Sequence, residues 1–179
     1  MANFKDKLNE SLKDFINEQK MFFTATAPTE GRVNLSPKGI DSFRILDDNT
    51  VAYLDLTGSG NETSAHIQEN GRMTIMFCGF TDTPLILRLY GRGEVVKKDS
   101  IKWLEMSDLF PHYDGERQII VLHVESLQTS CGFGVPVYEY VGDKTSSKRL
   151  KNWEHRLTKE EYWQEKNLKS IDGLPTNIL

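Results

Sequence analysis

The chain has 179 residues, 38% of them hydrophobic and 27% charged, so we expect a folded globular protein and not a disordered one. The formal net charge of −4 argues against a nucleic-acid-binding surface spread over the whole molecule, though not against one local basic site. The first residues lack the apolar core of a signal peptide, and no stretch approaches the length of a membrane span. We therefore expect no membrane partner. The two cysteines, Cys78 and Cys131, form no CxxC pair; both are predicted to be small buried residues in a reducing cytoplasm.

The first part of the chain predicts one helix followed by short strands. Apolar residues recur at helical spacing over 4–16, with Asn3 as a start signal. Residues 21–27 are rich in aromatic and β-branched side chains and predict a strand that ends at Pro28. Residues 32–36 alternate as its hairpin partner, and Pro37 and Gly39 are expected to break the pairing. A further short strand is predicted over 43–46.

The middle of the chain predicts three more strands and a helix. A strand over 51–56 leads into the turn Gly58-Ser59-Gly60, and a helix begins with Asn61 as its N-cap and ends near Gly71. Residues 72–80 are apolar on both faces and predict a central strand. The long strand over 85–96 contains Gly91 and Gly93, which allow a bulge or a sharp bend.

The last part predicts a helix over 99–110, an apolar strand over 119–124 and a glycine-rich turn over 129–134. Two helices are predicted over 147–157 and 158–168, the second with a capping box from Thr158 to Glu161. The tail at 170–175 is too apolar and too turn-specific for a loose end. Residues 1–179 are thus predicted to form a single domain, mainly β (α+β), as an antiparallel barrel with peripheral helices.

The turn at residues 57–63 is a candidate anion site. A helix start presents free backbone N–H groups, and the helix dipole favours negative charge there. An ordinary capped turn explains the same residues, because Asn is a favoured N-cap with or without a ligand.

Several segments together resemble the FMN-binding split β-barrel family of pyridoxamine 5′-phosphate oxidase. They are residues 31–39 (Gly-Arg-Val-Asn-Leu-Ser-Pro-Lys-Gly), 53–63 (Tyr-Leu-Asp-Leu-Thr-Gly-Ser-Gly-Asn-Glu-Thr), 87–93 (Leu-Arg-Leu-Tyr-Gly-Arg-Gly), 129–136 and 166–175. The resemblance covers most of the chain and rests on the order and spacing of all five segments. It implies a six-stranded split barrel and a homodimer with FMN bound at the subunit interface.

The resemblance also implies which residues hold the flavin. The strand around Asn34 and Ser36 would run along the ring and ribityl chain, and the segment around Thr57–Thr63 would close on the phosphate. The cofactor-binding residues it implies are Arg32, Val33, Asn34, Leu35, Ser36, Lys38, Tyr53, Thr57, Ser59, Gly60, Asn61, Thr63 and Arg88. For Asn34 and Ser36 the alternative is a solvated sheet face; for Lys38 it is a solvated charge, and for Arg88 a surface ion pair.

Two differences from the oxidase bear on function. Where the oxidase carries a Ser-Arg-Lys phosphate clamp, this chain has Asn61-Glu62-Thr63 with no cation, so Lys38 or Arg88 would have to supply one. Ile86 replaces a glutamine of the oxidase. These differences argue against the vitamin B6 oxidase reaction and favour hydride transfer through FMN to or from another small molecule. The alternatives are a non-catalytic flavin-binding redox or stress module, a binder of deazaflavin F420 or haem, and a structural dimer that has lost its site.

No catalytic acid, base or metal ligand can be named from the sequence. The four histidines have no ligand spacing, which argues against metal and against haem. His66 lies near the predicted site but is expected at the surface. Cys131 has no nearby positive charge that would make it a reactive thiolate, and Trp153 and Trp163 are expected to serve in packing.

Overall fold

A computed structural model describes residues 3–144 and 158–179 of the chain. Its elements are β1 (Asn3–Lys5), α1 (Glu10–Glu18), β2 (Met21–Thr26), β3 (Asn34–Gly39), β4 (Phe43–Ile45), β5 (Thr50–Leu56), α2 (Glu62–Asn70), β6 (Arg72–Cys78), β7 (Leu85–Lys97), α3 (Ile101–Met106), the 3₁₀ helix η1 (Ser107–Leu109), β8 (Glu116–Cys131) and α5 (Lys159–Lys166). The helix predicted over 147–157 lies outside the described residues.

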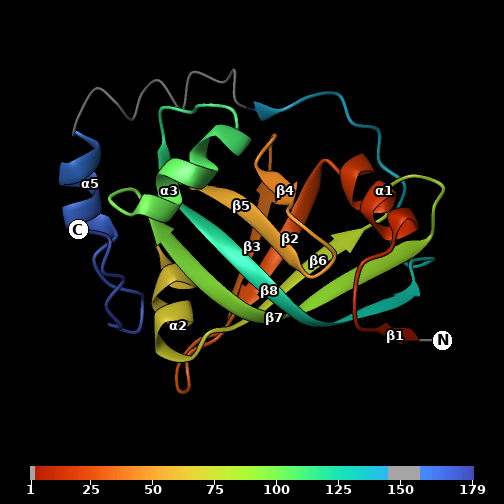
Figure 1. The fold of residues 1–179 in the computed structure, drawn as a ribbon, viewed down its shortest axis with the longest axis horizontal. Coiled ribbons are helices and arrows are strands. Elements are labelled where there is room, and N and C mark those ends of the chain that lie inside the picture. The colour runs from red at the N-terminus through yellow and green to blue at the C-terminus, as the bar shows by residue number, and fades with distance from the viewer. Residues whose placement is uncertain (1–2, 145–157) are drawn as a thin grey trace.

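The strands form one antiparallel sheet in the order β3-β2-β6-β7-β8-β5-β4, and β1 pairs with β8 beyond the end of β5. Since β3 and β4 lie at opposite ends of that order, the sheet is a curled half-barrel with two edges. The long strands β7 and β8 cross the middle of the molecule, with α1 and the N-terminus at one end and α5 with the C-terminus at the other (Figure 1). The predicted antiparallel class is confirmed, but the sheet formed by the described residues has eight strands and not six.

The start of the chain differs from the prediction. Residues 3–5 are a strand, and the helix begins only after Asn9, whose side chain accepts a hydrogen bond from the Leu12 N–H at 3.0 Å. The helical pattern was extended too far because the partner of residues 3–5, on β8, is more than a hundred residues away. The apolar stripe itself is confirmed, since Leu8, Leu12, Phe15 and Ile16 are buried, whereas Phe4 is 63% exposed.

The second strand of the predicted hairpin is displaced along the chain. β3 runs from Asn34 to Gly39, so the strand predicted over 32–36 was placed too early. Pro37 and Gly39 do not break the pairing; they lie opposite Phe23 and Met21 on β2. β3 is an edge strand, where a missing proline N–H need not interrupt a hydrogen-bonded ladder.

The two longest strands confirm the bend that the glycines predicted. The register between β7 and β8 shifts between Tyr90 and Gly91, and a Cβ at Gly91 would overlap the His123 carbonyl oxygen. β8 continues to Cys131, so the turn predicted over 129–134 begins later than expected. Cys78 is buried as predicted, but Cys131 is exposed, and both thiols are free.

Strand β5 is buried on both faces, which explains its apolar sequence. On one face Val51 and Tyr53 join the core that α1 covers, and Tyr53 packs edge-on against Phe22 with ring centres 5.5 Å apart. On the other face Ala52 and Leu54 pack with residues of α3. These two layers fix β5 firmly, and the turn at residues 57–61 follows directly from its end.

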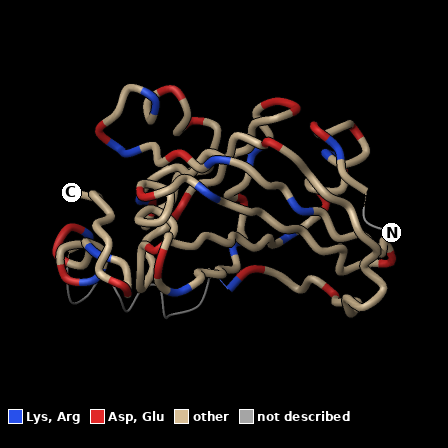
Figure 2. Tube along the Cα trace, turned by 90° about the horizontal axis from the view of Figure 1, so that it is seen from below, with Lys and Arg blue, Asp and Glu red and all other residues tan. Residues whose placement is uncertain are grey.

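The described surface mixes charges of both signs. Lys and Arg are interspersed with Asp and Glu along the chain, without a long stretch of one sign (Figure 2). None of the described helices is both long and apolar enough to traverse a bilayer. Within the same residues, no group of three or more His, Cys, Asp or Glu side chains could hold a metal ion.

Candidate functional site

A buried carboxylate, Asp55 near the end of β5, organises the region around the predicted anion turn. It is 1% exposed. Arg117 binds one of its oxygens through Nη2 at 2.7 Å and Nε at 3.0 Å, and Gln118 Nε2 binds the same oxygen at 2.9 Å. Lys38 Nζ binds the other oxygen at 2.7 Å. A charge this deeply buried is tolerated only when its partners are also buried beside it.

The two cations beside Asp55 favour the ionised form of its carboxyl group. Burial alone would raise the pKa of Asp55, but the charges of Arg117 and Lys38 outweigh it and hold the pKa well below its usual range. Burial alone would lower the pKa of Lys38, but Asp55 outweighs it and raises that pKa. The ion group therefore ties together β3, β5 and β8 where these strands approach the turn.

Arg117 also helps to hold the turn, together with two residues near the end of the chain. Arg117 Nη1 donates to the Gly60 carbonyl at 3.0 Å and to Asn167 Oδ1 at 2.9 Å. Asn167 Nδ2 donates to the Gly58 carbonyl at 3.1 Å, and Trp163 Nε1 donates to Thr57 Oγ1 at 2.9 Å. Helix α5 thus packs against the turn. The exposed Ser59 lies at the outer tip of the turn.

Asn61 occupies the predicted N-cap position of α2, but its side chain does not cap the helix. Its Oδ1 instead accepts a hydrogen bond from Gln118 Nε2 at 2.8 Å, and the residue is 2% exposed. Buried donors on β8 compete successfully for the oxygen that would otherwise cap α2. No described residue accepts a hydrogen bond from the backbone N–H groups of residues 59–63, so the helix start keeps its free donors.

The polar face of β3 points toward α2. Asn34 Nδ2 donates to Thr63 Oγ1 at 3.1 Å and to Thr26 Oγ1 at 3.3 Å, and Ser36 Oγ donates to Asn34 Oδ1 at 2.8 Å. His66 Nδ1 lies 3.0 Å from Thr26 Oγ1. His66 is fully buried, which corrects the expectation of a surface histidine. Asn34 and Ser36 therefore belong to a partly buried polar network, not to a fully solvated sheet face.

The apolar face of β3 points outward. Leu35 is 63% exposed and Val33, just before the strand, is 73% exposed. Among the described strands β3 pairs only with β2, so its second backbone edge is free. Exposed edge strands with apolar side chains are typical of surfaces that a ligand or another chain covers.

Three predicted residues lie away from the turn or deep in the core. Tyr53 is buried, which raises its pKa to about 12 against the opposing effect of Lys38. Arg88 donates to Ser130 and lies opposite Gln128 on β8, whereas the end of β5 lies opposite Glu116 at the other end of that strand. Arg32 pairs with Asp172 of the C-terminal tail. The structure thus brings Lys38 near the turn but not Arg88.

Sequence reasoning missed Arg117, Gln118 and Asn167. Arg117 and Gln118 directly precede the apolar run that predicts β8. Two long polar side chains at the start of a central strand were the feature in the sequence that could have marked them as buried site residues. Nothing local marks Asn167, which lies at the end of α5 and is fully buried. Trp163 was expected to pack, and it does, but its indole N–H also binds the predicted site residue Thr57.

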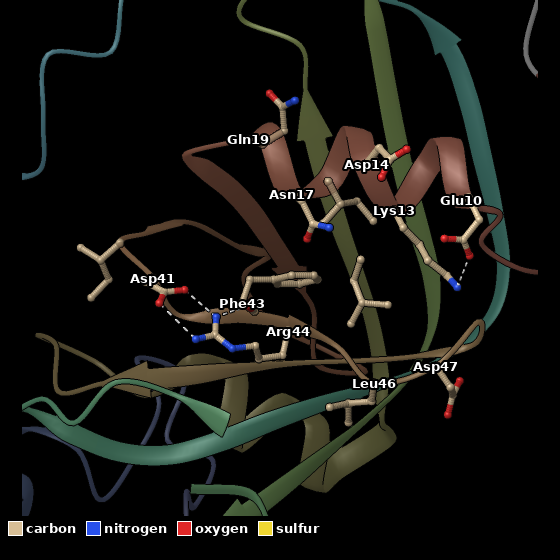
Figure 3. A pocket seen from close by; sticks show the side chains of 13 residues that line it. Glu10, Lys13, Asp14, Asn17, Gln19, Asp41, Phe43, Arg44, Leu46 and Asp47 are labelled. Atoms are coloured by element: carbon tan, nitrogen blue, oxygen red, sulfur yellow. Dashed lines mark hydrogen bonds and ion pairs between the residues drawn. The ribbon is translucent and has the colours of Figure 1, made fainter. Parts of the chain in front are cut away.

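Two hollows of the described residues differ in character. One, of about 470 Å³, lies between α1 and β4, and there the charged side chains pair with one another, Arg44 with Asp41 and Lys13 with Glu10 (Figure 3). The other, of about 530 Å³, is mainly apolar and includes the β3 residues Pro37, Lys38 and Gly39. The second adjoins the strand that the resemblance assigns to the cofactor, and a third hollow, of about 420 Å³, includes the predicted cofactor residue Val33.

Comparison with known proteins identifies the family. The family model described as pyridoxamine 5′-phosphate oxidase matches residues 8–131. A curated relative, the pyridoxamine 5′-phosphate oxidase family protein ustO of Aspergillus flavus, is 38% identical over 197 residues, covering 98% of this chain and 78% of that protein. The chain belongs to the pyridoxamine 5′-phosphate oxidase family, as the motifs predicted.

Solved structures support the same fold. HupZ from Group A Streptococcus is 26% identical, with a TM-score of 0.52, over 67% of this chain and 91% of that one. A putative pyridoxamine 5′-phosphate oxidase from Lactobacillus delbrueckii is 19% identical, with a TM-score of 0.56, over 69% of this chain and 94% of that one. The predicted split-barrel class is confirmed.

Proposed function

We propose that this chain is a flavin-binding protein that holds FMN between the outer side of β3 and the turn at residues 57–61. The proposal depends on one combination of features. The edge strand β3 exposes apolar side chains, and the N–H groups at the start of α2 have no acceptor among the described residues. A flavin ring has apolar faces and a polar edge, which suit Leu35 and the free backbone edge of β3. A phosphate suits the N–H groups and the positive dipole end of α2.

The phosphate site would rely on neutral donors. Lys38 and Arg117 lie beside the end of β5, and both already bind Asp55. Arg88 lies on β7 opposite Gln128, too far from the end of β5 to serve its own turn, so it could complete a site only from a second subunit. A homodimer with flavin at the interface, which would also cover Val33 and Leu35, is part of the proposal.

Bound FMN would supply hydride chemistry, and the residues of the chain would bind and orient it and exclude water. The substrate would be a small molecule that enters the apolar hollow beside Lys38. We propose an oxidoreductase acting in the cytoplasm, where the free thiols Cys78 and Cys131 would stay reduced.

A visible spectrum of the purified protein, followed by titration of the apo-protein with FMN, tests the proposal. We expect flavin absorption bands, or uptake of added FMN at one equivalent per chain. A colourless protein that takes up no FMN would refute it. Parallel titrations with F420 and haem would reveal another cofactor.

A flavin-binding module without turnover is the second candidate. It is favoured by the fact that the ionisable groups packed beneath the turn, Asp55, Lys38 and Arg117, are all committed to one another. In that case the FMN-loaded protein would oxidise NADH, NADPH or pyridoxamine phosphate no faster than free flavin. Rates well above free flavin would instead establish the enzyme.

A further inference from the structure

Besides Gln118, which donates to the Asn61 side chain, three side chains hold the turn at residues 57–61 from its buried side, and all three do so as donors. Trp163 Nε1 binds the Thr57 hydroxyl, Asn167 Nδ2 binds the Gly58 carbonyl and Arg117 Nη1 binds the Gly60 carbonyl. Each partner in the turn is therefore an acceptor. The Gly58 and Gly60 carbonyls and the Thr57 hydroxyl oxygen are thus satisfied on the inside, whereas the N–H groups of residues 59–61 have no acceptor among the described residues.

Peptide geometry then fixes the direction of two N–H groups. In a planar trans peptide the C=O and N–H bonds point in opposite directions. Because Asn167 holds the Gly58 carbonyl, the N–H of Ser59 in the same peptide faces away from Asn167. By the same argument the N–H of Asn61 faces away from Arg117.

The hydroxyl of Thr57 is oriented by a related constraint. An indole N–H can only donate, so Thr57 Oγ1 must accept the bond from Trp163. Its own hydrogen remains available for another acceptor. The side of the turn opposite α5 is thus set to donate hydrogen bonds, as an anion requires.

The orientation of Asn167 is itself fixed by its neighbours. Arg117 carries only donors, so the amide oxygen of Asn167 must face Arg117 and the amide nitrogen must face Gly58. Asn167 is fully buried. Its backbone N–H donates to the Trp163 carbonyl, and its backbone carbonyl accepts a hydrogen bond from Thr176 Oγ1. It has little freedom to adopt another arrangement.

We propose that Trp163 and Asn167 are positioning residues that keep the turn in its anion-binding form, an inference that rests on the proposed function. They act through Thr57 and Gly58 and do not touch the phosphate themselves. The family model ends at residue 131, so these residues lie outside the part of the chain that it matches. Helix α5 with its following residue would therefore determine how strongly this chain prefers FMN over riboflavin, the same flavin without its phosphate.

The test compares the dissociation constants of FMN and riboflavin for the apo-protein. Asn167→Asp keeps an acceptor toward Arg117 but places an oxygen against the Gly58 carbonyl, and FMN affinity should fall about tenfold. Riboflavin affinity should change less than about twofold, because riboflavin makes no phosphate contact. Trp163→Phe keeps the aromatic ring, removes the N–H without changing charge, and should lower FMN affinity about threefold to fivefold.

Asn177→Asp is the matched control. Asn177 is exposed in the C-terminal residues that follow α5, and it bonds to Gln68. Its FMN and riboflavin affinities should equal those of the wild type. Equal losses of FMN and riboflavin in the two test variants, or no loss of either, would overturn the inference. A wild type that binds riboflavin as tightly as FMN would instead overturn the proposed phosphate site. If Asn167→Asp does not fold, Trp163→Phe decides alone.

Discussion

The molecule contains two groups of charges with similar geometry and opposite surroundings. Around Asp55, Lys38 and Arg117 approach a carboxylate that is 1% exposed in its side chain. Around Asp48, Lys7 and Lys13 approach a carboxylate that is 44% exposed, at 3.2 and 2.9 Å. The N–O distances are comparable, so the two groups differ mainly in how much water reaches the carboxylate.

The carboxyl pKa is lowered in both groups, but burial opposes the neighbouring cations to a different extent in each. At Asp48 the hydrogen bond from Lys13 is the largest influence and little burial opposes it. At Asp55 burial is the largest single influence and the two cations must overcome it. Removing a cation should therefore matter far more at Asp55, and only that group supports the turn of the candidate site.

Arg117→Met should have the largest effect. It leaves the buried Asp55 with Lys38 as its one remaining cation, beside the neutral Gln118, and removes the bonds to Gly60 and Asn167. We expect the free energy of unfolding to fall by about 3–5 kcal/mol, measured by urea denaturation. A loss no larger than that of a surface lysine variant would show that the Asp55 group does not stabilise the fold.

The pH dependence of stability should distinguish Asp55 from the exposed carboxylates. A lowered carboxyl pKa gives stability that is present above the unfolded-state pKa, near 4, and lost as pH falls toward the folded-state pKa. The stability difference between wild type and Asp55→Asn should be constant from about pH 5 to 8. Below about pH 4 it should shrink by up to about 1.4 kcal/mol per pH unit. A difference that grows on acidification would contradict the sign of the shift.

Lys38→Met should cost less than the arginine variant. Arg117 and Gln118 still satisfy Asp55, and the lysine side chain is 22% exposed. We expect a loss of about 1–3 kcal/mol in the free energy of unfolding. A loss equal to that of Arg117→Met would mean that both cations are equally required.

Lys13→Met on the exposed group should have the smallest effect. Its partners Glu10 and Asp48 remain well hydrated when the lysine is removed. We expect the urea midpoint and the FMN affinity to match those of the wild type. A clear change in FMN affinity would connect the hollow between α1 and β4 to function.

The framework of the sheet could be read from the sequence because its signals are local. Alternation and apolar runs predict β5, β6 and β7, and the bulge at Gly91 follows from a glycine in a long strand. The edge strand β3 was misplaced because proline is disruptive only where a ladder needs its N–H, and pairing position is not a local property.

The interior of the candidate site could not be predicted for the same reason. Asn61 is a good N-cap by type, yet Gln118 takes its side chain because folding brings β8 against the turn. Arg117 and Asn167 are fifty residues apart in sequence and bond to each other. The resemblance predicts the outer residues of the site, whereas the buried contacts beneath them depend on tertiary structure.

The central claim is that an anion binds at the outer tip of the turn, and a charge placed there tests it most directly. Ser59 is exposed, and Ser59→Asp should leave stability unchanged while lowering FMN affinity about tenfold by repelling the phosphate. Ser11→Asp, at an exposed serine of α1, is the matched control and should bind FMN as the wild type does. The account predicts that riboflavin affinity is the same in all three proteins. Unchanged FMN affinity in Ser59→Asp would contradict it and place the phosphate elsewhere.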